Sequence, residues 1–196
     1  MNKLEGFYEL NRVGIPSVPW KEYDATVSLD DSMLWTIRSA VLAGQDLNLP
    51  RKVGVCAEEA KSFADSLIKS MKDQGLVLYY PFFIAEKSGV LEVANDKVVV
   101  EAVKEDLWNL VTHGKKDVTI IKSNESQTCI GDETFLQQDE LEELLGYSNK
   151  VKMKFRDVLH QGKSVFLEWS YAYTSDINKN SIGERRLVFY EIRSVS

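Results

Sequence analysis

The stretches VFLEWSYAY, residues 165–173, and RRLVFYEIRSV, residues 185–195, decide how this chain folds. Both are rich in aromatic and β-branched residues, which is typical of β-strands, and each carries a carboxylate among apolar neighbours. Such a carboxylate needs a cation, a metal or water, because burying it unpaired costs several kcal/mol or forces protonation. Glu168, Glu191 and Arg193 on neighbouring strands therefore predict a site for a metal and a phosphate.

The side chains of a strand alternate between its two faces, and this alternation predicts where the charged groups point. Glu168 is expected on the face opposite Leu167. By the same rule, Glu191 and Arg193 are expected to share the face of Phe189. The alternative interpretation is that both glutamates face water on an antiparallel sheet and pair with arginines of the same segments.

Composition restricts the class of protein more than the chemistry. The chain has 196 residues, of which 44% are hydrophobic and 28% charged, as in an ordinary globular protein. Its net charge of −6 argues against a nucleic-acid or anionic-membrane partner, and no apolar run is long enough to span a bilayer. The segment after Met1 lacks the features of a signal peptide, so we expect a cytoplasmic protein. Cys56 and Cys129 are far apart and outside metal-binding spacings, which favours two free thiols.

The pattern along the chain predicts an α+β protein with approximate lobes at residues 1–75 and 76–196. Helical spacing and turn residues predict, in the first lobe, a helix at 4–13, a strand at 34–40 and a helix at 57–72. An antiparallel meander is expected next, with strands at 76–85, 89–93 and 97–103 and turns at 87–89 and 95–96. The terminal strands should follow a short helix at 107–113, a hairpin at 117–122 and 127–130, and a long helix at 138–160.

The terminal strands resemble those that close the nucleotide-binding domain of phosphoenolpyruvate synthase and pyruvate phosphate dikinase. That family reads approximately DIEWA and LYxLQxRPV where this chain has FLEWSYA and LVFYEIRSV. Further segments resemble the family in the same order. GIPSVPW at 14–20 resembles its GLPVPPGF segment, LWTIRSA at 34–40 resembles its VRSSA strand, and Asp46-Leu47 resembles its Asp-Leu pair. Residues 88–90, 99–102 and 111–114 resemble its GVxFT, IEA and VVSG segments, respectively.

This resemblance implies an ATP-grasp architecture, in which ATP and Mg²⁺ lie in a cleft between two small α+β lobes with antiparallel sheets. It also implies a role for each matched residue. Lys3 and Arg38 would contact phosphates, Glu168 and Glu191 would bind magnesium, and Arg193 would hold the terminal phosphates, with both arginines acting in catalysis. The residue types agree, because phosphoryl transfer needs cations at the phosphate oxygens and hard oxygen ligands for Mg²⁺.

Several residues keep a second interpretation. Glu101 either approaches the nucleotide or faces water, and Arg38 either binds phosphate or anchors a loop. Trp35, Trp108 and Trp169 are most simply core residues, although one of them could line an adenine pocket.

The chain also departs from the family in ways that bear on activity. Glu191 stands where the family usually has glutamine, and residues 106–109 replace the family's GLGE segment. Neither His113 nor His160 lies in a motif resembling the family's phosphorylated histidine. The first hypothesis is therefore a phosphotransfer protein that passes a phosphoryl group to a histidine on a separate protein or to a small acceptor. The alternatives are a nucleotide-binding pseudoenzyme or sensor without turnover, and an interaction domain; a homo-oligomer is compatible with each.

Overall fold

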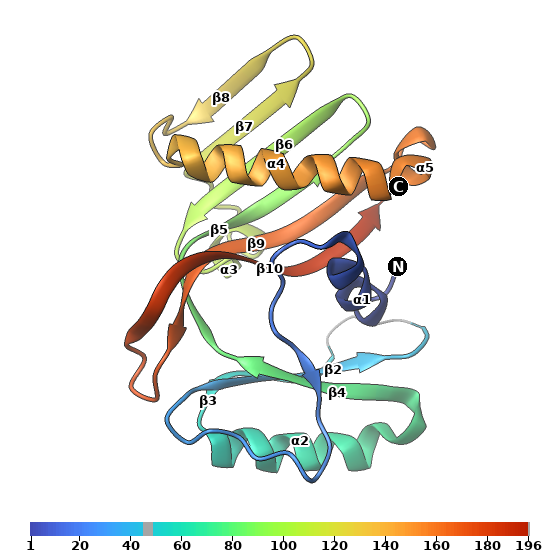
Figure 1. The fold of residues 1–196 in the computed structure, drawn as a ribbon, viewed down its shortest axis with the longest axis vertical. Coiled ribbons are helices and arrows are strands. Elements are labelled where there is room, and N and C mark those ends of the chain that lie inside the picture. Colours follow the sequence, from blue (N-terminus) through green and yellow to red (C-terminus); the bar gives the residue numbers. More distant parts are fainter. Residues whose placement is uncertain (45–48, 196) are drawn as a thin grey trace.

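The computed structural model describes residues 1–44 and 49–195 and confirms an α+β fold with two antiparallel sheets (Figure 1). The Asp46-Leu47 pair lies outside the described residues. Within the described part of the chain, no helix is long and apolar enough to cross a membrane.

The smaller sheet has four strands in the order β1-β4-β2-β3. The strands are β1 (Lys21–Glu22), β2 (Trp35–Val41), β3 (Arg51–Val55) and β4 (Gly75–Pro81). One face is covered by α2 (Ala57–Met71), whose buried residues Ala57, Ala60, Ala64 and Leu67 recur at helical spacing and pack on the sheet. A short 3₁₀ helix, Lys72–Gln74, connects α2 to β4, so Gly75 begins a strand.

The larger sheet has six strands in the order β10-β9-β5-β6-β7-β8. The strands are β5 (Phe83–Val93), β6 (Lys97–Lys104), β7 (Val118–Ser123), β8 (Gln127–Gly131), β9 (Ser164–Ser175) and β10 (Ser181–Val195), with the short helix α3 (Trp108–Val111) after β6. Helix α4 (Gln138–Lys154) crosses one face of this sheet, and α5 (Arg156–His160) follows it (Figure 1). The main hydrophobic core lies between α4 and the sheet.

Helix α1 (Lys3–Val13) joins the two halves of the molecule. Its N-terminus carries a capping box between Asn2 and Glu5, and the Asn2 side chain also donates to the carbonyls of Val41 and Leu42 at the end of β2. The helix packs closely on β10, since a Cβ at Gly6 would lie 2.6 Å from the Ile192 carbonyl oxygen. The start of the chain therefore touches both sheets.

The meander differs from the prediction in two places. The expected strand at 76–85 is divided, because β4 pairs with β2 in the smaller sheet while β5 pairs with β9 in the larger one. The turn expected at 87–89 is wrong, since β5 runs through it with only a register shift between Ala85 and Lys87. The hairpin at 95–96 and the hairpin of β7 and β8 are confirmed. Strand β3 was not predicted.

The long helix expected at 138–160 is two helices. Phe155 leaves the helical conformation with φ −104° and ψ 22°, and the chain restarts as α5. The break lets Leu159 reach the main core, where it is buried, and lets Phe155 and Val158 pack against the same core. Packing therefore overrides the continuous helical pattern.

The predicted faces of β10 are corrected by a β-bulge at Tyr190. Phe189 pairs with Trp169, but Glu191 pairs with Glu168, so one extra residue stands on β10. The bulge moves Glu191 and the residues after it to the opposite face from the one that simple alternation predicts. Glu191 consequently shares its face with Glu168 instead of with Phe189.

Candidate functional site

A cavity of about 890 Å³ lies between the two sheets and is lined from both of them. The smaller sheet contributes Arg38 on β2, and the larger sheet contributes Glu168 on β9. Of the six residues that the sequence singles out, five line this cavity: Lys3, Arg38, Glu168, Glu191 and Arg193. Residues far apart in the sequence thus meet in one place.

Two opposed carboxylates line the cavity. Glu168 and Glu191 are direct cross-strand partners on β9 and β10, and the side chain of Glu191 is only 13% exposed. Burial, together with the negative charge of Glu191, raises the pKa of Glu168, although Arg193, Arg38 and Lys3 act in the other direction. Like charges opposite one another destabilise a sheet, so this pair calls for a cation between or beside it.

Arg38 supplies one cation from the smaller sheet. Its guanidinium lies 3.8 Å from the Glu191 carboxylate and 5.6 Å from the centre of the Phe7 ring. Burial alone would lower the pKa of Arg38, but Tyr80, Glu191 and Glu168 outweigh it and raise the pKa. The arginine therefore stays charged although its side chain is only 12% exposed.

Lys3 and Arg193 complete the cationic group. Lys3 is the first residue of α1, whose capping box fixes the start of the helix beside the cavity. Arg193 lies two residues beyond Glu191 on β10 and is exposed. Both side chains act electrostatically on Glu168.

Glu101 is placed elsewhere. It is on β6, two strands away from Glu168, and does not line the cavity. Its carboxylate forms an ion pair with Lys116 at the surface. Its approach to a nucleotide therefore stays a prediction, and in this structure its carboxylate is paired with Lys116 outside the cavity.

Sequence reasoning missed a polar row next to the carboxylates. The hydroxyl oxygens of Ser88 and Ser170 lie 2.7 Å apart, both residues are buried, and both line the cavity. Tyr190, the bulge residue, also lines it, and burial raises its pKa despite a hydrogen bond with Ser170. The alternation in LEWS was the available signal, because Ser170 lies two residues from Glu168 and hence on the same face.

Trp108 is also placed differently from the prediction. The simpler interpretation, a core residue, is wrong for Trp108, since it is 51% exposed and lines the cavity. A contact between one of the tryptophans and adenine stays a prediction. Arg51, on the unpredicted strand β3, lines the cavity as well.

The donor set is suited to a hard divalent cation that also has a ligand outside the protein. Glu168 and Glu191 offer carboxylate oxygens, and among residues 1–44 and 49–195 no cluster of three or more His, Cys, Asp or Glu able to hold a metal is found. Mg²⁺ is characteristically held by one or two carboxylates plus water and phosphate oxygens. The two glutamates fit this mode.

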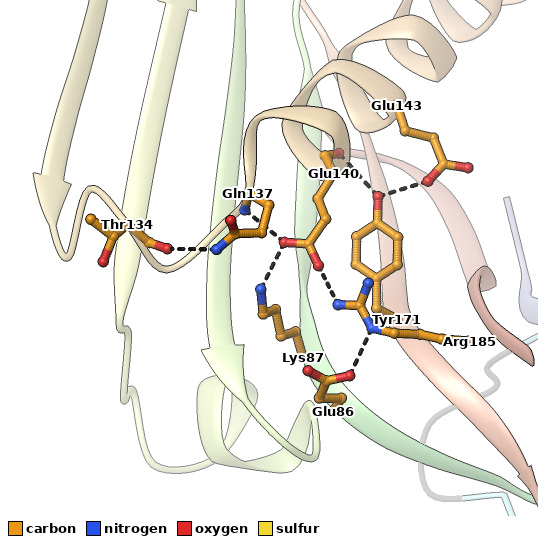
Figure 2. Close-up of polar contacts among 8 residues, drawn as sticks. All are labelled: Glu86, Lys87, Thr134, Gln137, Glu140, Glu143, Tyr171 and Arg185. Atoms are coloured by element: carbon orange, nitrogen blue, oxygen red, sulfur yellow. Dashed lines mark hydrogen bonds and ion pairs between the residues drawn. The ribbon is translucent and has the colours of Figure 1, made fainter. Parts of the chain in front are cut away.

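The face of the larger sheet behind the cavity is fixed by a buried ionic network (Figure 2). Glu140 of α4 is 3% exposed; Lys87 donates to it at 2.7 Å, and Arg185 binds its other oxygen. The Tyr171 hydroxyl donates to the Glu143 carboxylate at 2.8 Å. Since Lys87 immediately precedes Ser88, the network holds a strand that lines the cavity on its other face.

Comparison with known proteins identifies the fold. No protein-family model and no curated protein sequence matches the chain. Among solved structures, a D-alanine–D-alanine ligase from Helicobacter pylori superposes with a TM-score of 0.52 at 13% identity, covering 98% of this chain and 50% of the ligase. A macrocyclase from Microcystis aeruginosa bound with its precursor peptide superposes with a TM-score of 0.46 at 10% identity, covering 97% of this chain and 51% of the macrocyclase. A D-alanine–D-alanine ligase from Bacillus anthracis superposes with a TM-score of 0.46 at 10% identity, covering 97% of this chain and 55% of that ligase.

The likeness to the Helicobacter pylori ligase shows an ATP-grasp-like fold. The chain spans about half the length of these structural relatives. This similarity, together with the two antiparallel sheets, confirms the expected fold class.

Proposed function

We propose that this ATP-grasp-like protein binds ATP with Mg²⁺ in the cavity between its sheets and transfers a phosphoryl group. The acceptor would be a histidine on a separate protein or a small molecule. The main support is the register of β9 and β10, which sets Glu168 and Glu191 side by side, opposite Arg38 of the other lobe. The specific likeness to phosphoenolpyruvate synthase and pyruvate phosphate dikinase rests on the sequence motifs.

Each residue has a defined part in this proposal. Glu168 and Glu191 would hold Mg²⁺, and the metal would neutralise charge on the phosphate oxygens. Arg38 presents a planar fork of donors that can bind two phosphate oxygens at once, which a lysine cannot reproduce. Lys3 and Arg193 add positive charge around the same phosphates. The buried position of Arg38 and Glu191 strengthens these interactions by excluding water.

The proposed transfer forms one bond and breaks one. An acceptor nitrogen or oxygen forms a bond to the transferred phosphorus while the bond from that phosphorus to the nucleotide's bridging oxygen breaks. The electron pair of the broken bond stays on the departing nucleotide. A neutral imidazole attacks with its lone pair, whereas a hydroxyl acceptor releases its proton to solvent. The protein contributes positioning and charge stabilisation.

Trp108 favours a second candidate function, a nucleotide sensor without turnover. It stands in the segment that replaces the family's GLGE and lines the cavity, whereas glycines at this segment would let the backbone approach a ligand. A sensor would bind MgATP with the same residues and form no product. Both candidate functions therefore require MgATP binding by the same residues, and only the phosphotransfer protein forms a product.

Thermal-shift titration with MgATP, MgGTP and MgAMP tests the proposal. We expect a nucleoside triphosphate to raise the melting temperature of the wild type, because binding at a hundredfold excess over Kd stabilises the folded state by about 2.7 kcal/mol. Arg38→Ala and Arg193→Ala should lose most of this gain, while Arg156→Ala, at an exposed position on α5, should keep it. Nucleotide-independent melting of the wild type would refute the proposal and its sensor variant together. A positive shift without release of a phosphorylated product or of ADP or AMP would select the sensor.

A further inference from the structure

The cavity has a second cationic position, at its more exposed end. Arg51 on β3 and Trp108 on α3 both line the cavity, and the Arg51 guanidinium lies 5.9 Å from the centre of the indole ring. Arg51 is exposed and Trp108 is 51% exposed, whereas Arg38 and Glu191 are largely buried. The two residues come from different lobes and face each other across the opening.

Strand register fixes the direction of Arg51. It is the direct cross-strand partner of Arg38, so both side chains leave the same face of the smaller sheet. The next residue, Lys52, points to the other face, where it pairs with Glu59 and lies over the Phe63 ring of α2. The sheet thus directs Arg51 into the cavity and Lys52 away from it.

The two adjacent arginines differ in how their charge is balanced. Arg38 lies beside Glu191, but no ion pair to Arg51 is found within residues 1–44 and 49–195. Directly opposed like charges destabilise a sheet by up to about 1 kcal/mol. An anion bound at Arg51 would offset this repulsion.

The aromatic side of the opening is held in place. The Asp106 carboxylate accepts the Trp108 backbone N–H at 2.8 Å, and the Glu105 carbonyl accepts from the Ser88 hydroxyl at 2.5 Å. Both acids also line this end. The Asp106 carboxylate is engaged by the Trp108 N–H, and that of Glu105 lies 3.8 Å from Lys104 Nζ. Arg51 therefore remains the group at this end suited to receive an anion.

We propose that Arg51 and Trp108 form a separate subsite for the anionic group of the phosphoryl acceptor, which is a carboxylate or a phosphate. This inference rests on the proposed function. The triphosphate would occupy the buried end with Arg38, Glu168 and Glu191. The acceptor would enter from the exposed end, where a guanidinium can bind two of its oxygens and the indole shields them from water. Because the subsite draws on both lobes, a bound acceptor also holds the lobes together.

Titration of two simple anions tests this subsite. Inorganic phosphate and, separately, acetate are titrated at constant ionic strength into the protein alone and into protein saturated with the Mg²⁺ complex of a non-hydrolysable ATP analogue. Tryptophan fluorescence reports on Trp108, and calorimetry gives the affinity. The variants are Arg51→Gln and Trp108→Phe, with Lys52→Gln as a matched control that removes a positive charge from the same strand on its other face.

We expect phosphate or acetate, or both, to bind beside the analogue, and the anion that binds more tightly indicates whether the acceptor's group is a phosphate or a carboxylate. Arg51→Gln should weaken the binding of that anion about tenfold or more, as expected when a hydrogen bond to a charged group is lost. Lys52→Gln should leave its affinity unchanged. Trp108→Phe should abolish the fluorescence change and retain the heat of binding.

Three results would overturn the proposed subsite. The first is competition between the anion and the ATP analogue, which would assign Arg51 to the triphosphate. The second is an anion affinity that Arg51→Gln does not change, and the third is no anion binding either by the protein alone or by the protein saturated with the analogue. The titration without nucleotide separates the two proposals. Arg51-dependent anion binding by a protein that does not bind the analogue would support an anion site and refute the proposed function.

Discussion

Glu168 and Glu191 are the residues on which the account of the cavity depends. Their cross-strand pairing concentrates negative charge where burial already disfavours it, and the raised pKa of Glu168 reflects both effects. In the absence of a ligand, the protein would be more stable with a neutral side chain in place of one of the two glutamates. The loss of stability caused by two opposed carboxylates is explained if the pair binds a cation.

This view predicts that Glu168→Gln stabilises the ligand-free protein at neutral pH. The folded-state pKa of Glu168 is raised, so its carboxyl group favours folding when protonated, and that contribution is lost as the pH rises through the folded-state pKa. The neutral amide would remove the neutral-pH cost and raise the melting temperature by a few degrees, since each kcal/mol corresponds to about 2–4 °C in a chain of this size. The difference from the wild type should shrink on acidification.

The same variant should lose the additional stabilisation that Mg²⁺ gives in the presence of ATP. Glu101→Gln is the matched control, because Glu101 lies on the same face of the larger sheet but outside the cavity. A Glu168→Gln protein that is less stable than the wild type at neutral pH and still responds fully to Mg²⁺ would contradict this view.

The residue types of the site were predictable, and their immediate neighbours were not. Carboxylates and an arginine inside apolar strands stand out in any sequence, so Glu168, Glu191 and Arg38 could be found from their surroundings. The bulge at Tyr190 left no signal, since a single added residue preserves the apolar pattern on both sides of it. Arg51 was missed because β3 is short and has no buried residue, and because its sequence RKVGV lacks the regular alternation of apolar and polar residues that marks a half-buried strand.

Secondary-structure elements position these residues through close contacts that the sequence pattern does not reveal. At Gly89 on β5, a Cβ would lie 2.0 Å from the Glu101 carbonyl oxygen and 2.5 Å from the ring of the fully buried Trp169. Glycine is required here by the approach of neighbouring atoms. The sequence pattern Lys87-Ser-Gly89 had instead suggested a turn.

Gly89→Ala should therefore destabilise the protein by about 1–3 kcal/mol, the usual cost of overpacking. Gly146→Ala in α4 is the matched control, since a Cβ there meets no atom within 4 Å and alanine favours a helix by about 0.5–1 kcal/mol. Urea unfolding of both variants measures the effect. Equal stability of the two would show that the strands around Gly89 are less closely packed than described.

Helix α4 is fastened to the larger sheet by Glu140. Burial alone would raise the pKa of Glu140, but hydrogen bonds from Lys87, Arg185 and the Gln137 N–H outweigh it and lower the pKa. Glu140→Gln should cost about 3 kcal/mol at neutral pH, because it removes the carboxylate that pairs with the largely buried Lys87 and one of the two carboxylates that pair with Arg185, which keeps Glu86. Glu142→Gln, at an exposed position of the same helix, should cost little.

The pH dependence of this difference is an independent check. A carboxylate with a lowered folded-state pKa stabilises the fold above its unfolded-state pKa, and the stabilisation is lost as the pH falls through the folded-state pKa. The melting temperatures of the wild type and Glu140→Gln should therefore converge in acid. A constant difference down to strongly acidic pH would contradict the assignment.

At the scale of the whole molecule, α1 and the crossing from β4 to β5 bring the two sheets together around the cavity. The collinear motifs predicted this architecture, because LWTIRSA, FLEWSYA and LVFYEIRSV fall on β2, β9 and β10, the strands that carry Arg38, Glu168 and Glu191 to the cavity. The hydrophobic pattern alone did not reveal that residues 76–85 are shared between two sheets, because a buried strand has the same apolar pattern in whichever sheet it pairs. The lobe boundary at residue 75 remains a prediction, and β4, which follows it, pairs with the strands before it.

Residues from the start, the middle and the end of the chain are proposed to hold a magnesium-bound triphosphate together. A crystal structure with Mg²⁺ and a non-hydrolysable ATP analogue would show whether they do. We expect a metal ion about 2.0–2.1 Å from oxygens of Glu168 and Glu191, with Arg38 bound to the triphosphate. A nucleotide bound elsewhere on the protein, or a cavity that stays empty at saturating analogue, would contradict it.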